Sequence, residues 1–228
     1  MSWNDQLYIY TKKRGGTYLG RMEEKRALTD ESYMQHGGMA LLTHKGAPLL
    51  IKSWCDMDRY SIQRGVQVQL NCELERPYFF SMTPKNILRK GLSVIMTGKE
   101  KEYGFPEVTA GRGIKTDNKE FTKAVLRDLE LRNALMKNTD YGLDIEPNAP
   151  KCVRGGSHCI TAWCRLDSGM AGSIAPEWGI LDTDGVYTNP EQLDSPAFTQ
   201  KLDDLVSLAK IAHDALVTIE YNEVRKRG

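Results

Sequence analysis

The sequence lacks an excess of charge of either sign. Its 228 residues include 31 lysines and arginines against 30 aspartates and glutamates, so the formal net charge is +1. A surface that binds nucleic acid needs a positive field, because contacts with the phosphate backbone supply much of the binding energy. The near balance of charges therefore predicts a chain that does not bind nucleic acid.

Long apolar stretches are also missing. No run approaches the roughly 18 apolar residues that indicate a membrane-spanning helix. The first ten residues carry Asn4, Asp5 and Gln6 where a signal peptide would be apolar. We therefore expect a cytoplasmic protein with no membrane insertion.

Cysteine is sparse and irregularly spaced. The five cysteines include no C-x-x-C pair, which argues against both a disulfide framework and a zinc knuckle. The soft metal ligands cluster only at Cys152, His158, Cys159 and Cys164. In a strand over 158–166, Cys159 and Cys164 would point to opposite faces, and His158 would lie about 20 Å from Cys164. We therefore expect reduced thiols and no metal site.

Signatures of catalysis are missing as well. No G-x-x-x-x-G-K-[ST] phosphate loop occurs, and Gly111-Arg-Gly113 alone does not form a dinucleotide fingerprint. The four histidines, at positions 36, 44, 158 and 213, belong to no recognisable nucleophile motif. The sequence thus gives no support for an enzyme, and we expect no cofactor.

Strand patterns dominate the first half of the chain. Between Val66 and Glu75, apolar and polar residues alternate without a break, which predicts a strand with one buried face and one solvated face. Such alternation is typical of an antiparallel sheet. We expect further strands at 7–11, 41–43, 49–54, 78–82, 92–97, 143–146 and 158–166, hairpin turns at 44–48 and 184–185, and a helical turn at 30–36.

Two long helices complete the predicted fold. Asp117 and Glu120 have the spacing of a capping box, and apolar residues continue at helical spacing as far as position 137. Ser195 and Pro196 begin a second apolar-faced helix that extends to about 221. The sequence therefore predicts an α+β protein, mostly antiparallel sheet, with helices at 117–137 and 195–221 packed on it. We expect a single domain over 1–228, or two subdomains with a boundary in the glycine-rich loop 98–115.

One polar pair stands out in the first helix. Asp128 and Arg132 are four residues apart, of opposite charge, and project near the middle of the apolar arc. Charges that face a core are costly unless they satisfy each other. We expect a structural ion pair, and the alternative is that the two residues bind a ligand.

Two features of the second half of the chain are Thr116-Asp117 with Phe121 four residues later, and the run from Leu129 to Met136. On these residues, the second half resembles a family of uncharacterised bacterial proteins known only as a domain of unknown function. Tyr18-Leu-Gly-Arg21 is similar to an early strand region of that family. Members often carry membrane-spanning segments, whereas this sequence has no such stretch. The resemblance implies a bacterial protein and assigns no catalytic residue.

These observations rank three classes of function. A non-catalytic binding or assembly module comes first, because no catalytic constellation is visible. A small-ligand carrier with a pocket between the sheet and the C-terminal helix comes second, and an enzyme of unrecognised type comes third. For partners we expect a second copy of the chain, which the regular 66–75 strand would recruit if it lay at a sheet edge, or an unidentified protein or small molecule.

Overall fold

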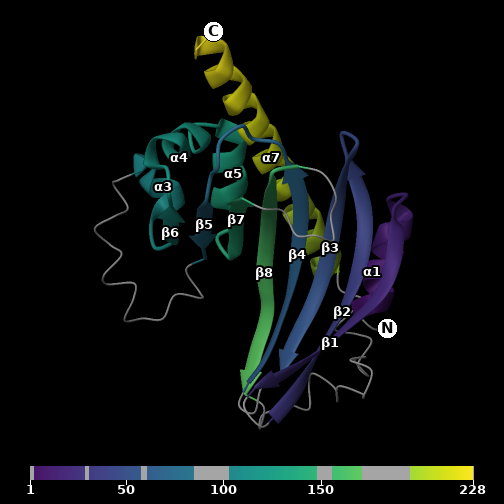
Figure 1. Cartoon of the computed structure of the whole chain (residues 1–228). Coiled ribbons are helices and arrows are strands. Elements are labelled where there is room, and N and C mark those ends of the chain that lie inside the picture. Colours follow the sequence, from purple (N-terminus) through teal and green to yellow (C-terminus); the bar gives the residue numbers. More distant parts are fainter. Residues whose placement is uncertain are drawn as a thin grey trace. The chain divides into compact units, whose positions relative to one another are not determined.

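An eight-stranded antiparallel sheet with helices packed on it forms the fold, which confirms the predicted α+β class. The structure, a computed structural model, describes residues 3–28, 31–57, 61–84, 103–147, 156–170 and 196–227. The strands follow the order β1-β2-β3-β4-β8-β7-β5-β6 (Figure 1). They are β1 (Thr17–Leu28), β2 (Glu31–His44), β3 (Ala47–Met57), β4 (Ser61–Cys72), β5 (Phe80–Thr83), β6 (Gly113–Thr116), β7 (Tyr141–Pro147) and β8 (His158–Met170). The helices are α1 (Trp3–Lys13), α3 (Pro106–Thr109), α4 (Lys119–Val125), α5 (Leu129–Lys137) and α7 (Pro196–Arg227).

The chain divides into two compact units. The first comprises residues 1–67 and 164–203, and the second comprises residues 68–163 and 204–228. The divisions fall inside β4, β8 and α7, so each of these elements contributes residues to both units. The described residues of the 98–115 loop all belong to the second unit, and a subdomain boundary there stays a prediction.

In the first unit, a helix replaces the strand that was expected at 7–11. Leu7, Tyr10 and Thr11 are buried, and their spacing of three and four residues places them on one side of α1. Aromatic and β-branched residues favour a strand locally, but α1 buries this side against β1 and β2. The Tyr10 hydroxyl also donates to Asp203 Oδ1 at 2.9 Å, which connects α1 to the beginning of α7.

Strand β2 occupies residues 31–36, where the structure replaces the helical turn that was expected at 30–36. Strands β1 and β2 pair antiparallel from Thr17 opposite Leu41 to Leu28 opposite Glu31. A ladder of that length satisfies the backbone of both strands, which outweighs a weak local preference for a helical turn. The expected turn between β2 and β3 is confirmed, since Lys45 and Gly46 have φ values of 50° and 83°, as a two-residue hairpin loop requires.

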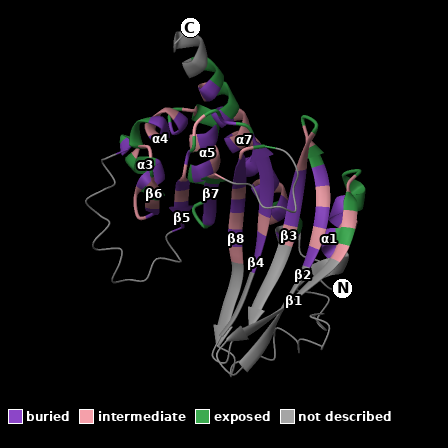
Figure 2. Cartoon of the chain, in the orientation of Figure 1, coloured by how far each residue is buried: buried purple, intermediate pink, exposed green. Residues whose placement is uncertain are grey.

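The alternating strand is confirmed in β4, but its surroundings differ from the prediction. Val68 and Leu70 are fully buried, as the pattern predicted. Gln69 and Asn71, on the face expected to be solvated, are also only 8% and 4% exposed. Figure 2 colours most of the described part of β4 as buried. Strand β4 lies between β3 and β8. Its backbone is therefore already paired on both sides, so the strand does not lie at a sheet edge, which was the condition for self-pairing through it.

The predicted 117–137 helix is two shorter helices, α4 and α5. Asn118, not Asp117, caps α4, because its side chain accepts the Phe121 N–H at 3.0 Å. Asp117 instead accepts the Phe79 N–H at 3.0 Å. The break lies before Asp128, whose extended backbone and side chain cap α5. Apolar spacing continues across the break, so periodicity alone did not reveal it.

The C-terminal helix predicted at 195–221 is confirmed as α7, which extends to Arg227. In the second unit it buries one side completely, as the zero exposure of Leu205, Leu208 and Leu216 shows. Glu220 holds this part of α7 to the segment that follows β4, because its Oε1 accepts the Glu75 N–H at 3.1 Å. Within the part of the chain that the structure describes, no helix combines the length and apolarity needed to span a membrane.

Candidate functional site

The structure does not pair Asp128 with Arg132. Asp128 Oδ1 accepts the Leu131 N–H at 2.8 Å, so the carboxylate caps α5 and faces its own helix end. Arg132 lies 4.6 Å from the centroid of the Phe105 ring, and its NH1 is 3.7 Å from Glu107 Oε1. The predicted ion pair is wrong because a helix begins between the two residues. Whether either of them binds a ligand stays a prediction.

Arg132 lies on the outer side of α5 together with exposed apolar residues. Leu129 and Met136 are 61% and 40% exposed, and seven residues separate them, so both project on the side that carries Arg132. Phe105 and Glu107, from the start of α3, complete this surface through their contacts with Arg132. We call these five residues the α5 outer face. Arginine, methionine and aromatic side chains are enriched at protein interfaces, so this surface has the chemistry of a protein contact.

A hydroxyl and an imidazole lie side by side at the start of β8. Ser157 Oγ is 2.8 Å from His158 Nδ1, and His158 Nε2 accepts the Tyr78 N–H at 3.0 Å. Because Nε2 accepts, the neutral ring carries its proton on Nδ1 and donates it to Ser157. Ser157 Oγ in turn donates to Leu74 O at 3.0 Å. The imidazole is thus a donor to the serine and not its general base, so the pair is not arranged as a nucleophile.

Carboxylates surround this imidazole. His158 is 1% exposed, and burial lowers its pKa. The negative charges of Glu220, Glu73 and Asp117 raise this pKa, but burial has the larger effect. Glu220 is itself 6% exposed, and its Oε2 lies 3.2 Å from the Arg76 Nε. Burial and the hydrogen bond from Tyr78 both favour the neutral ring.

The described thiols are buried. Burial raises the pKa of Cys72 to about 12, which leaves almost no thiolate near neutral pH. Cys159 Sγ lies 3.7 Å from Thr161 Oγ1, on the opposite side of β8 from His158 in the alternation of the strand. Cys152 lies outside the described residues. The second unit therefore does not bring His158 and Cys159 together as metal ligands.

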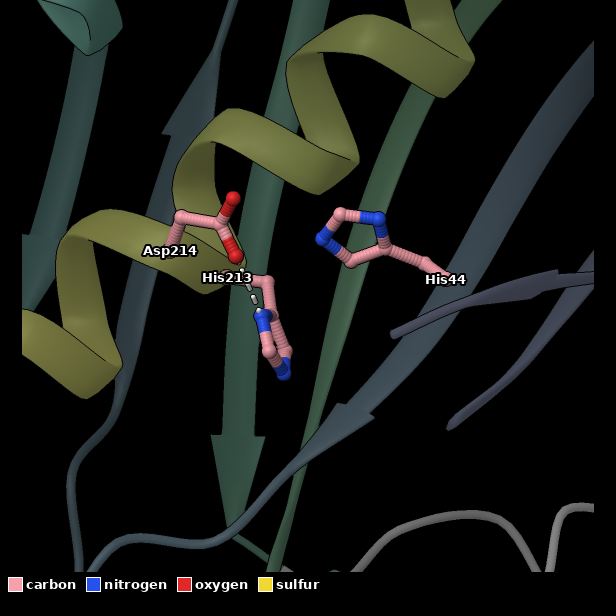
Figure 3. Close-up of side chains that lie close together, drawn as sticks. All are labelled: His44, His213 and Asp214. Atoms are coloured by element: carbon pink, nitrogen blue, oxygen red, sulfur yellow. Dashed lines mark hydrogen bonds and ion pairs between the residues drawn. The ribbon is translucent and has the colours of Figure 1, made fainter. Parts of the chain in front are cut away.

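A second histidine forms a local contact on α7. His213 Nδ1 lies 3.0 Å from Oδ1 of the next residue, Asp214 (Figure 3). His213 is half-buried, as expected for the edge of the apolar side of this helix. Figure 3 also draws His44, the last residue of β2, which belongs to the first unit. A contact between successive residues of one helix does not by itself make a site.

Sequence reasoning missed a tryptophan that lies across the neighbouring strand. Trp163 Nε1 donates to Asp144 Oδ2 at 2.7 Å, and the indole covers Gly142, where a Cβ would lie 2.2 Å from the ring. Burial raises the pKa of Asp144, while hydrogen bonds from Ser81 and Trp163 lower it. The signal in the sequence was Gly142 inside a strand, since such a glycine marks a close approach. The indole is thereby fixed on this face of the sheet.

We predict that Gly142→Ala lowers the free energy of unfolding by about 1–3 kcal/mol, because the added methyl displaces the indole and overpacks the contact. Thermal melts of Gly142→Ala, Trp163→Leu and the double variant measure this effect. The double variant should lose less stability than the sum of the two single variants, because Trp163→Leu removes the ring that the methyl meets. Additive losses would mean that the glycine is needed for another reason.

Comparisons with known proteins give one structural similarity. The sequence matches no protein-family profile and no curated protein. Among solved structures, the chain is similar to the crystal structure of the mycobacterial trehalose monomycolate transport factor A, TtfA, with a TM-score of 0.49 and 9% identity over 93% of each chain. The family resemblance drawn from the sequence therefore stays a prediction.

Proposed function

We propose that this chain is a non-catalytic assembly module of the bacterial cytoplasm, which contacts a second copy of itself through the α5 outer face. The observation that carries the proposal is the exposure of Leu129 and Met136, 61% and 40%, on either side of Arg132. A helix that only covers a core directs such side chains inward. Their exposure favours a partner that covers them.

The composition of the α5 outer face supports a protein partner. Arg132 packs on Phe105 and faces Glu107, so its guanidinium is already partly desolvated before any partner binds. Its Nε is buried and has no hydrogen-bond partner among the described residues. A twofold arrangement would place the same helix of the second copy against this face.

The states of the reactive groups favour binding over catalysis. Ser157 and His158 use their hydrogen-bonding atoms to hold the 74–78 backbone, and the Cys72 thiol is buried. A nucleophile needs a base that can take its proton, and in this pair the donor and acceptor roles are reversed. These groups therefore stabilise the second unit. A binding function would use the outer surface of that unit.

We predict that the wild-type chain forms dimers and that Leu129→Ser combined with Met136→Ser makes it monomeric. Both side chains are exposed, so the substitutions should change the melting temperature little. Light scattering over a concentration series measures the mass. Leu19→Ser is the matched control, because Leu19 is also exposed, at 48%, but lies on β1.

Three results would overturn the proposal. A wild-type mass equal to one chain at every accessible concentration would exclude self-assembly. Dimers that survive the double substitution would exclude the α5 outer face as the contact. Loss of dimers in Leu19→Ser but not in the double variant would exclude it as well.

A further inference from the structure

Side chains hydrogen-bond the connection between β4 and β5 at several points. This connection comprises residues 73–79. Its Leu74 N–H binds Ser157 Oγ at 2.9 Å, and three further N–H groups find acceptors on three separate elements. The Glu75 N–H binds Glu220 Oε1 at 3.1 Å, the Tyr78 N–H binds His158 Nε2 at 3.0 Å, and the Phe79 N–H binds Asp117 Oδ1 at 3.0 Å. One of these three acceptors is the buried imidazole of His158.

His158 differs from the two carboxylates in what a proton does. A protonated carboxyl group keeps lone pairs that accept hydrogen bonds, whereas an imidazolium donates from both nitrogens and accepts from neither. Protonation at Nε2 would place an N–H against the Tyr78 N–H, which now lies at 3.0 Å. The hydrogen bond between the connection and β8 is therefore lost in the charged form.

The charged ring would have other partners nearby. Charged groups reach it from each neighbouring element: Glu73 and Arg76 from the connection, Asp117 from the turn after β6, and Glu220 from α7. Arg76 is paired with Glu220 and lies 4.9 Å from the centroid of the Phe121 ring. An imidazolium would compete with Arg76 for Glu220. The region thus has two alternative sets of contacts, one for each protonation state of His158.

We propose that His158 is a proton-operated latch, which holds the 73–79 connection on β8 when neutral and releases it when protonated. Protonation would first free the Tyr78 amide. Because the Tyr78 side chain contacts α4, a movement of Tyr78 would also change the packing on that helix. The Tyr78 ring lies 4.7 Å from that of Phe121, and its hydroxyl is 2.9 Å from Thr122 Oγ1. Acidification would therefore loosen the packing between the connection and α4.

The direction of the pH dependence follows from the environment of the ring. Burial lowers the pKa of His158 in the folded chain below its usual value of about 6.5, so the unfolded chain binds the proton more tightly. The contribution of His158 is fully present above pH ~6.5 and decreases as the pH falls toward the folded pKa. The hydrogen bond from the Tyr78 N–H to His158 is thus kept at neutral pH and is lost as the pH falls through the folded pKa of His158.

Nuclear magnetic resonance of the whole chain tests this proposal between pH 7.5 and pH 4.5. We expect the His158 ring protons to titrate below pH ~6.5. Below the folded pKa, the exchange protection of the Tyr78 amide, corrected for intrinsic pH dependence, should fall by up to about tenfold per pH unit. In His158→Gln, whose amide oxygen can accept the same N–H but cannot be protonated in this range, the protection should stay constant.

His213→Gln is the matched control, because it removes the other described histidine of the second unit, which is half-buried, and should leave the Tyr78 response unchanged. Three results would overturn the latch: a His158 ring that does not titrate above pH 4.5, a ring that titrates while Tyr78 keeps its protection, or a Tyr78 response that persists in His158→Gln. The wild-type titration decides the first two without any variant. The readout does not depend on whether the chain dimerises.

Discussion

Deleting residues 204–228 should give a chain that is insoluble or lacks a cooperative unfolding transition. This part of α7 buries Leu205, Val206, Leu208 and Leu216, each at most 7% exposed. At roughly 1.5–3 kcal/mol for each buried side chain, the loss is about 6–12 kcal/mol, comparable with the whole stability of a typical domain. Deletion also removes Glu220, the acceptor of the Glu75 N–H.

A shorter truncation provides the control for this deletion. Removing residues 223–228 keeps Glu220 and every side chain of α7 that the structure shows to be buried. That chain should be soluble and melt within a few degrees of the wild type by circular dichroism. A soluble, cooperatively folded chain after the 204–228 deletion would show that α7 is dispensable for the fold.

Replacing Arg112 by methionine should lower the free energy of unfolding by about 3–5 kcal/mol. Arg112 is 5% exposed, and its NH2 donates to Leu135 O at 2.6 Å and to Asn138 O at 3.0 Å. It thus caps the C-terminal end of α5, where backbone carbonyls lack partners within the helix. Hydrogen bonds from a charged donor contribute about 1.5–3 kcal/mol each, and methionine removes both, so that Asn138 O keeps only the bond from the Tyr141 N–H.

Urea unfolding of three variants separates the hydrogen bonds of Arg112 from its charge. Arg112→Lys keeps the charge but has one nitrogen in place of two terminal ones, so it should recover only part of the loss. Arg127→Met is the matched control, because Arg127 is exposed and should cost less than about 0.5 kcal/mol. An Arg112→Met variant as stable as the wild type would mean that water or a rearranged backbone satisfies the carbonyls.

Patterns that repeat along the chain were predictable from the sequence. The alternation at 66–75 and the apolar spacing after 195 indicated β4 and α7, because burial of one side imposes a period on the residues. The hairpin at Lys45 and Gly46 was also predictable, since a two-residue loop between apolar strands has few solutions. The α+β class followed from these elements.

Features set by single hydrogen bonds were not predictable in the same way. The break between α4 and α5 depends on a hydrogen bond in which Asp128 accepts the Leu131 N–H. By spacing alone, Asp128 could equally well pair with Arg132 inside one continuous helix. Leu129 belongs to the apolar periodicity, yet it is 61% exposed because α5 begins there with a new orientation. Local patterns do not contain this change in direction.

The candidate sites depend on contacts between residues that are far apart in the sequence. Tyr78 and His158 are separated by 80 positions, and no local motif connects them. Trp163 and Gly142 lie on different strands, and only the glycine within β7 suggested a close approach. The sequence located the elements, whereas strand order and register brought these residues together.

The outer strands of the sheet affect how this chain behaves when it is crowded. Strand β6 has four residues, and the exposed Lys115 lies on it. Strand β1 is longer, but its pairing with β2 is irregular between Tyr18 and Gly20, and charged residues fill its sequence from Arg21 to Arg26. Short, irregular and charged edges are poor templates for a foreign strand. Highly concentrated or newly synthesised chains are thereby protected from growing into cross-β fibres.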